Sequence, residues 1–144
     1  MIKVADFMTR ELVTVQEHDD LALAESILRL GGVRHLPVVH RGKLVGLVTQ
    51  RDLLRSGASG GGPTARAILA RDIMTREVTT VGPEVPLADA ASLMLRHKYG
   101  CLPVCAPDAT LLGIITESDF VRFAADVVRD MDLVQEAVAT RGDA

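Results

Sequence analysis

The sequence has little of several residue types, and each scarcity excludes a class of protein. Its 144 residues contain no tryptophan and only 3% aromatic residues, so the core must be aliphatic. The net charge of −3 offers no basic surface to nucleic acid or to an anionic membrane. No apolar run approaches the roughly 20 residues that span a bilayer, and the first residues lack the apolar stretch of a signal peptide. We therefore expect a cytoplasmic protein with no nucleic acid and no membrane among its partners.

Cysteine is scarce too, since only Cys101 and Cys105 are present. On one strand their Cα atoms would lie about 13 Å apart, whereas a disulfide requires less than about 7 Å. We expect two reduced thiols that behave as small buried hydrophobic groups.

Internal repetition, in contrast, is abundant. Three segments of the first half return in the second half: Asp6–Glu11 as Asp72–Glu77, Leu36-Pro37-Val38 as Leu102-Pro103-Val104, and Gly46–Asp52 as Gly113–Asp119. The first two pairs are 66 positions apart and the third is 67 apart, so one extra residue lies in a loop between Val104 and Gly113. A two-fold repeat predicts two pseudo-symmetric units that share one core.

Each unit is expected to run strand, helix, strand, strand, helix. We predict strands at residues 12–15, 36–39, 44–48, 78–81, 102–105 and 111–116. We predict helices from Asp19 or Asp20 to Gly31, from Thr49 to about Arg55, from Thr64 to Met74, and from Pro86 to about Lys98. The expected organisation is a first unit at 1–56, a flexible Gly-rich linker at 57–66, a second unit at 67–125, and an extended C-terminal helix at 117–140.

The last helix carries a seam of apolar residues at heptad-type spacing. Its members are Phe120, Ala124, Val127, Met131, Val134 and Val138. The helix could pack on its own domain, but its length beyond the repeat favours a partner. We expect a homodimer.

The pattern Gly-apolar-apolar-Thr-x-x-Asp, at Gly46–Asp52 and Gly113–Asp119, bears the candidate site. Thr and Asp at this spacing are typical of a helix capping box, which is a purely structural role. A helix N-terminus also binds anions, and a carboxylate one turn into the helix can accept both hydroxyls of a ribose. The pattern therefore fits either a cap or a nucleotide pocket.

With these motifs in order and duplicated, the chain resembles a tandem pair of cystathionine-β-synthase (CBS) domains, a Bateman module. The resemblance implies an α/β (α+β) fold of two β-α-β-β-α units packed sheet to sheet about a pseudo-two-fold axis. It also implies clefts between the units that hold AMP, ADP, ATP, S-adenosylmethionine or related adenosyl ligands. Such a module is a ligand sensor that regulates a separate protein, is not itself an enzyme, and requires no cofactor.

Carried onto this chain, the resemblance implies a set of nucleotide-binding residues. Asp52 and Asp119 would bind ribose hydroxyls, and Thr49, Thr116 and Ser118 would approach ribose or phosphate. The base would lie against Val13, Thr14 and Val15 or against Thr79, Thr80 and Val81. The segments Arg34, His35, Leu36, Pro37 and Gly100, Cys101, Leu102, Pro103 would face the clefts.

The two units differ where the charge of a ligand would lie. The first has Arg34 and His35 before its Leu-Pro-Val, and the second has Gly100 and Cys101. Arg34 can bind phosphate bidentately, and His35 could make that binding depend on pH; both could also be surface or packing residues. Gly100 could let a ligand approach the backbone. We expect unequal clefts, one that binds phosphate and one that is weaker or empty.

Three other functions remain open on the sequence. An enzyme is disfavoured because no phosphate loop or nucleophile elbow is present. A metal or thiol site at His35 and Cys101 has no zinc-type spacing. A structural dimerisation module with empty clefts is compatible with every pattern above.

Overall fold

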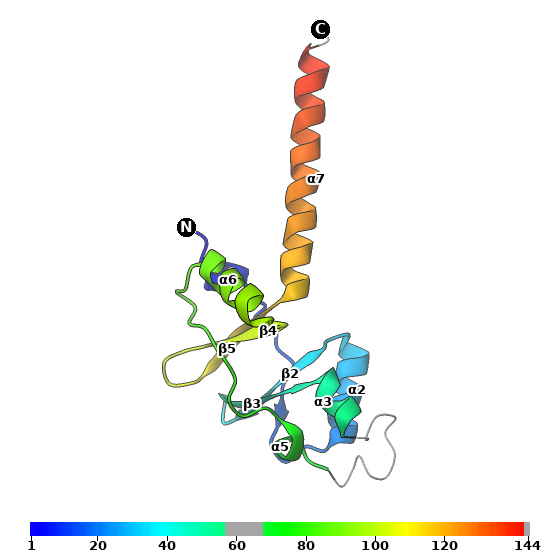
Figure 1. The fold of residues 1–144 in the computed structure, drawn as a ribbon, viewed down its shortest axis with the longest axis vertical. Coiled ribbons are helices and arrows are strands. Elements are labelled where there is room, and N and C mark those ends of the chain that lie inside the picture. The colour runs from blue at the N-terminus through cyan, green and yellow to red at the C-terminus, as the bar shows by residue number, and fades with distance from the viewer. Residues whose placement is uncertain (57–67, 143–144) are drawn as a thin grey trace.

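The computed structural model describes residues 1–56 and 68–142, and it has an α+β fold of two units (Figure 1). The expected linker at 57–66 lies outside the described residues, as does the first part of the helix predicted over Thr64–Met74. Of that helix, the structure shows α5 at Ala70–Ile73.

The first unit follows the expected order. It consists of β1 (Val15–Gln16), α2 (Leu21–Gly31), β2 (His35–His40), β3 (Lys43–Thr49) and α3 (Gln50–Arg55). β2 lies between β1, which is parallel to it, and β3, which is antiparallel. Asp20 caps α2 by accepting a 2.9 Å hydrogen bond from the Leu23 N–H, a contact worth about 1 kcal/mol. Arg41 and Gly42, with φ of 50° and 80°, form the two-residue turn between β2 and β3.

The second unit repeats this arrangement with α6 (Leu87–His97), β4 (Cys101–Cys105), β5 (Leu111–Thr116) and α7 (Glu117–Gly142). The strand predicted at 78–81 is wrong: only Val81 pairs, in a single parallel bridge with Val104. The strand predicted at 12–15 is likewise reduced to Val15–Gln16. Leu12 and Val13 line one cleft between the units and Val78 and Thr80 line another, so these residues face the clefts instead of pairing with a strand.

Each repeat begins by packing on the other unit. The short helix α1 (Val4–Phe7) is tied to the second unit by a 2.8 Å hydrogen bond from the Val4 N–H to the Val85 carbonyl. In the same way, α5 and its flanks complete the first core, where the Leu21 N–H donates to the Ile68 carbonyl at 3.0 Å. Both cores are aliphatic, as expected, and each one is closed by residues of both repeats.

Two of the repeated motifs meet across the pseudo-two-fold axis. The Thr9 N–H donates to the Ile114 carbonyl at 2.9 Å, and the Ile114 N–H donates to the Thr9 carbonyl at 3.0 Å. A Cβ atom on the neighbouring Gly113 would lie 2.7 Å from the Met8 sulfur and 2.8 Å from the Thr9 carbonyl oxygen. Gly46 is crowded in the same way by Met74 and Thr75. The glycine that opens each Gly-apolar-apolar-Thr-x-x-Asp motif therefore makes room for the Met-Thr of the other repeat.

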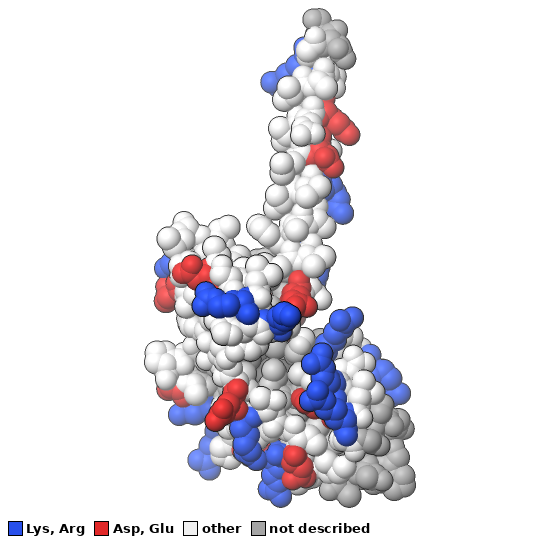
Figure 2. All heavy atoms as spheres, viewed as in Figure 1, with Lys and Arg blue, Asp and Glu red and all other residues white. Residues whose placement is uncertain are grey.

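Helix α7 extends well beyond the body of the molecule (Figure 1). Near its start, Phe120 and Phe123 contact the Phe7 ring, with centroid distances of 4.9 and 5.6 Å. Farther along, the seam residues are exposed: Met131 to 57%, Val134 to 63% and Val138 to 65%. In Figure 2 most of the charged side chains visible on this helix lie along its right-hand side, with one basic group on the left near the C-terminal end.

Cys101 and Cys105 are both free and buried on β4, as predicted. Among the helices in the described residues, none is both long enough and apolar enough to cross a membrane.

Candidate functional site

A cleft of about 330 Å³ lies between the two units. The first unit contributes residues of the segments 9–13 and 32–37, and the second contributes Gly100 and residues of the segment 114–122. Arg34 and His35 therefore share a cleft with Asp119 of the other unit and not with Asp52 of their own. The sequence alone left this pairing open.

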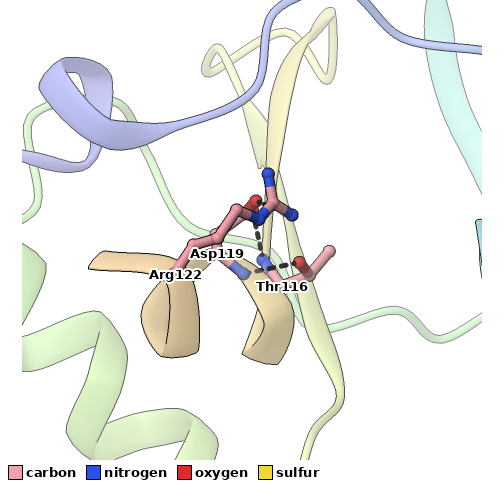
Figure 3. A network of polar contacts seen from close by, with 3 residues as sticks. All are labelled: Thr116, Asp119 and Arg122. Atoms are coloured by element: carbon pink, nitrogen blue, oxygen red, sulfur yellow. Dashed lines mark hydrogen bonds and ion pairs between the residues drawn. The ribbon is translucent and has the colours of Figure 1, made fainter. Parts of the chain in front are cut away.

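The carboxylate of Asp119 is held at the start of α7 (Figure 3). Its Oδ2 accepts the Thr116 N–H at 2.9 Å, and the Asp119 N–H donates to Thr116 Oγ1 at 3.3 Å. Its Oδ1 pairs with the Arg122 guanidinium at 3.4 Å. The Asp119 side chain is only 11% exposed, whereas Arg122 is 74% exposed. The predicted capping box is therefore present, and it fixes the Asp119 carboxylate at the wall of the cleft.

Asp52 makes the same reciprocal box with Thr49, at 2.8 and 3.2 Å. Thr49 and Asp52 line neither this cleft nor the second hollow described below. For this pair, the capping role is the one that the contacts show.

His35 is half-buried, lines the cleft and faces Gly100. A Cβ atom on Gly100 would lie 2.8 Å from His35 Nε2, so the missing side chain makes room for the imidazole. Burial lowers the pKa of His35 below its usual value; Glu117 opposes this change and Arg34 adds to it. At neutral pH His35 is therefore an uncharged hydrogen-bonding group, and Arg34 beside it supplies the positive charge.

Arg34 itself is exposed, but its backbone is fixed. Its carbonyl oxygen accepts a 3.1 Å hydrogen bond from the Gln50 N–H at the start of α3. The cleft also contains a second cation, Arg122, and the acids Glu11 and Glu117. The cleft is therefore lined by charges of both signs: Arg34 is exposed to an incoming anionic group, and Arg122 is paired with Asp119.

The predicted residues divide into two sets. Those that line the cleft are Val13, Arg34, His35, Pro37, Gly100, Thr116, Ser118 and Asp119. Those that do not are Thr14, Val15, Leu36, Thr49, Asp52, Thr79, Thr80, Val81, Cys101, Leu102 and Pro103. Several members of the second set, such as Leu36 and Leu102, are fully buried core residues.

Sequence reasoning missed part of the lining: Thr9, Glu11, Leu12, Gly32, Val33, Ile114, Glu117 and Arg122. The sequence contains a pattern that could have identified two of these residues. Arg122 stands three residues after Asp119, which places both on one helix face, and Thr9 belongs to the repeated Asp-x-Met-Thr motif.

A second hollow of about 280 Å³ opens beside the turns of the two hairpins. It is lined mostly by apolar residues, together with Thr80, Cys105 and the single charged residue Arg76. The Arg76 guanidinium donates to the Arg71 carbonyl at 3.1 Å. This hollow lacks the paired Thr and Asp of the larger cleft.

Metal ligands do not converge in the part of the chain that the structure describes: no three His, Cys, Asp or Glu side chains there are placed to hold an ion. Burial raises the pKa of the Cys101 thiol to about 12 and also raises that of Cys105. Both sulfurs are therefore protonated at neutral pH, whereas a metal-bound cysteine is a thiolate.

Comparison with known proteins places the chain in a family. The model of the CBS domain matches residues 4–59 and again 70–126. The protein belongs to the CBS domain family and carries two copies of the domain in tandem.

Solved structures of this family share the fold over nearly the whole chain. The protein AcuB of Vibrio cholerae is 39% identical, with a TM-score of 0.81 over 92% of this chain and 96% of its own. CBSX2 of Arabidopsis thaliana in complex with AMP is 31% identical, with a TM-score of 0.77 over 88% and 98%. The CBS domain pair of MJ0100, in complex with 5′-methylthioadenosine and S-adenosyl-L-methionine, is 27% identical, with a TM-score of 0.76 over 88% and 98%.

Relatives also include larger enzymes. Inosine-5′-monophosphate dehydrogenase of Korarchaeum cryptofilum (strain OPF8) is 36% identical over 117 residues, which are 81% of this chain. The match spans only 23% of the length of that enzyme.

Proposed function

We propose that this protein is a regulatory module that senses an adenosyl ligand at the Arg34–Asp119 cleft and controls a separate partner protein. The observation that carries the proposal is the joining, in one cleft, of a fixed carboxylate, a cation from the other unit and an apolar wall. Asp119 would accept the ribose hydroxyls, and Arg34 would bind phosphate. Leu12, Val13 and Val33 would contact the base.

The solved complexes of two relatives support the ligand class. AMP in one and S-adenosyl-L-methionine with 5′-methylthioadenosine in the other share the adenosyl group and differ beyond it. Arg34 and Arg122, with their positive charge, favour an adenosine phosphate for this chain.

A regulatory role accounts for the symmetry of the carboxylates better than a catalytic one does. Asp52 and Asp119 occupy the same position in the two repeats and make the same capping box. A general acid and a general base must both reach one substrate, whereas Asp119 lines the cleft and Asp52 does not.

Binding calorimetry with adenosine, AMP, ADP, ATP and S-adenosylmethionine tests the proposal. We expect an adenosine phosphate to bind the parent protein and to bind Asp119→Ala more weakly. Asp126→Ala is a matched control, because Asp126 is an exposed carboxylate on the same helix outside the cleft. If no member of the panel binds, the sensor proposal is wrong, and a structural dimerisation module becomes the better explanation.

We further propose that the partner of α7 is a second copy of this chain. The exposed seam continues the heptad spacing from Val127 to Val138. The spacing of the seam residues brings their side chains to one face of the helix, and most of the charged side chains visible on the helix lie along one side of it (Figure 2). Two such helices would cover each other's seams, whereas a lone helix leaves this surface in water.

A further inference from the structure

The repeat relates each cleft-lining residue of the first unit to a counterpart 66 positions later. Val13 corresponds to Thr79, and Val33 corresponds to Tyr99. In the open cleft the two valines line the same cavity and remain 48% and 38% exposed. In the second unit their counterparts touch: Thr79 Oγ1 donates to the Tyr99 hydroxyl at 3.1 Å.

The backbone around these positions is equivalent in the two units. Gly32 and its counterpart Lys98 both adopt left-handed φ values, 62° and 57°, where α2 and α6 end. On the other side, the carbonyls of Arg34 and Gly100 each accept a 3.1 Å hydrogen bond from the first N–H of the unit's last helix. Val33 and Tyr99 thus project from the same local fold, and the difference between them is the side chain.

Tyr99 is held firmly in its position. Its ring packs against the second core and stacks on His97 with a centroid distance of 5.2 Å and an interplanar angle of 19°. Its hydroxyl is satisfied by Thr79, so a ligand that displaced the ring would break this bond and expose apolar area.

We infer that Tyr99 closes the second nucleoside slot, which the repeat would place beside Thr79 and Asp52, so that this chain has a single working adenosyl site, the cleft of Arg34 and Asp119. The inference rests on the proposed function, since it counts sites for the same ligand. It makes Tyr99 the residue that determines how many ligands one chain binds. In this second slot Gly100 stands at the position equivalent to Arg34, so the slot lacks that positive charge. It would then also lack space for the nucleobase of a ligand.

Calorimetry with AMP tests this inference by stoichiometry. We expect one AMP per chain for the parent protein and two for Tyr99→Val, which copies the residue at position 33. The added site should disappear in the double variant Tyr99→Val/Asp52→Ala. Tyr99→Phe is the control: it removes the hydrogen bond but keeps the ring, so it should still bind one AMP.

The reciprocal exchange gives a second test that leaves the Tyr99 core packing untouched. Val13→Thr/Val33→Tyr should close the open cleft and lower AMP affinity at least ten-fold, with the circular dichroism spectrum unchanged. A parent protein with two AMP per chain, or a Tyr99→Val protein with one, would overturn the inference while the proposed function stands. A parent protein that binds no adenosyl ligand would overturn both.

Discussion

At the scale of single residues, one side chain carries both a structural and a binding role. Asp119 caps the first turn of α7 through Oδ2, and its Oδ1 is directed to Arg122 at the edge of the cleft. Because the cap already fixes the carboxylate, little side-chain entropy remains to be lost when a ligand hydroxyl binds it. Asp52 has the same cap without that cleft, so the two residues allow the roles to be separated.

We expect Asp119→Ala to weaken AMP binding by about 1.5–3 kcal/mol, the range for hydrogen bonds to charged groups. Asp52→Ala should lose a similar cap, worth about 1 kcal/mol of folding free energy, and leave AMP affinity unchanged. Calorimetry and urea unfolding on both variants measure the two effects. Equal affinities for parent and Asp119→Ala would remove Asp119 from the site.

The charge of Arg34 should matter in proportion to the phosphate on the ligand. Arg34→Ala should weaken ATP binding at least ten-fold, the lower end for a charge-assisted contact, and adenosine binding far less. Affinity of the parent for ATP should also fall as salt rises. Arg129→Ala, which removes an exposed arginine on α7, is the control. Equal losses for adenosine and ATP would mean that Arg34 only shapes the cleft.

Burial of His35 predicts a dependence of stability on pH. Because the pKa of His35 is lowered in the folded state, the unfolded chain takes up this proton first, near pH 6.5. The contribution of His35 to stability is therefore complete above about pH 6.5 and is lost as the pH falls toward the lower folded pKa. As the pH falls from 7.5 to 5, the free energy of unfolding measured with urea should decrease less for His35→Gln than for the parent. Parallel curves would place the imidazole in solvent.

At the scale of elements, the two units are joined because each repeat begins with a short helix that packs on the opposite unit. α1 and α5 each pack on the opposite unit, and the residues that follow them hydrogen-bond to the opposite hairpin. The same contacts place Thr9 and Ile114 side by side at the wall of the cleft. The site is therefore formed by this packing of each repeat on the opposite unit. A change that loosens the contact between Thr9 and Ile114 should affect both stability and binding.

Gly113→Ala tests that contact. The added methyl group would meet the Thr9 carbonyl oxygen, which is backbone and cannot rotate away. We expect a loss of about 1–3 kcal/mol in the free energy of unfolding, as for other overpacked sites. Gly82→Ala is the matched control, because nothing lies within 4 Å of its Cβ position. An unchanged urea midpoint for Gly113→Ala would show that the two units are not held together there.

At the scale of the whole molecule, local signals were predictable and the joining of the units was not. The Asp20 cap, the turn at Arg41-Gly42 and the Thr-Asp capping boxes depend on neighbours within four residues, and the sequence shows them directly. Residues 12–14 and 78–80 have the composition of strands, but Leu12, Val13, Val78 and Thr80 line the hollows between the units, and pairing begins only at Val15 and at Val81. The sharing of a cleft by Arg34 and Asp119 depends on how one unit faces the other, which no periodicity encodes.

The free surface of α7 leads to the last prediction, a homodimer in solution. Light scattering at tens of micromolar should give twice the mass of one chain, which allows for a dissociation constant near one micromolar. Met131→Asp/Val134→Asp would place charges in the seam and should give a monomer, because each unpaired charge would be buried between the helices. Asp126→Ser changes an exposed acidic residue outside the seam and should leave the dimer intact. The seam residues line no part of the cleft, so the monomeric variant should still bind AMP if it is folded. A parent protein that is monomeric at this concentration would mean that a different partner covers α7.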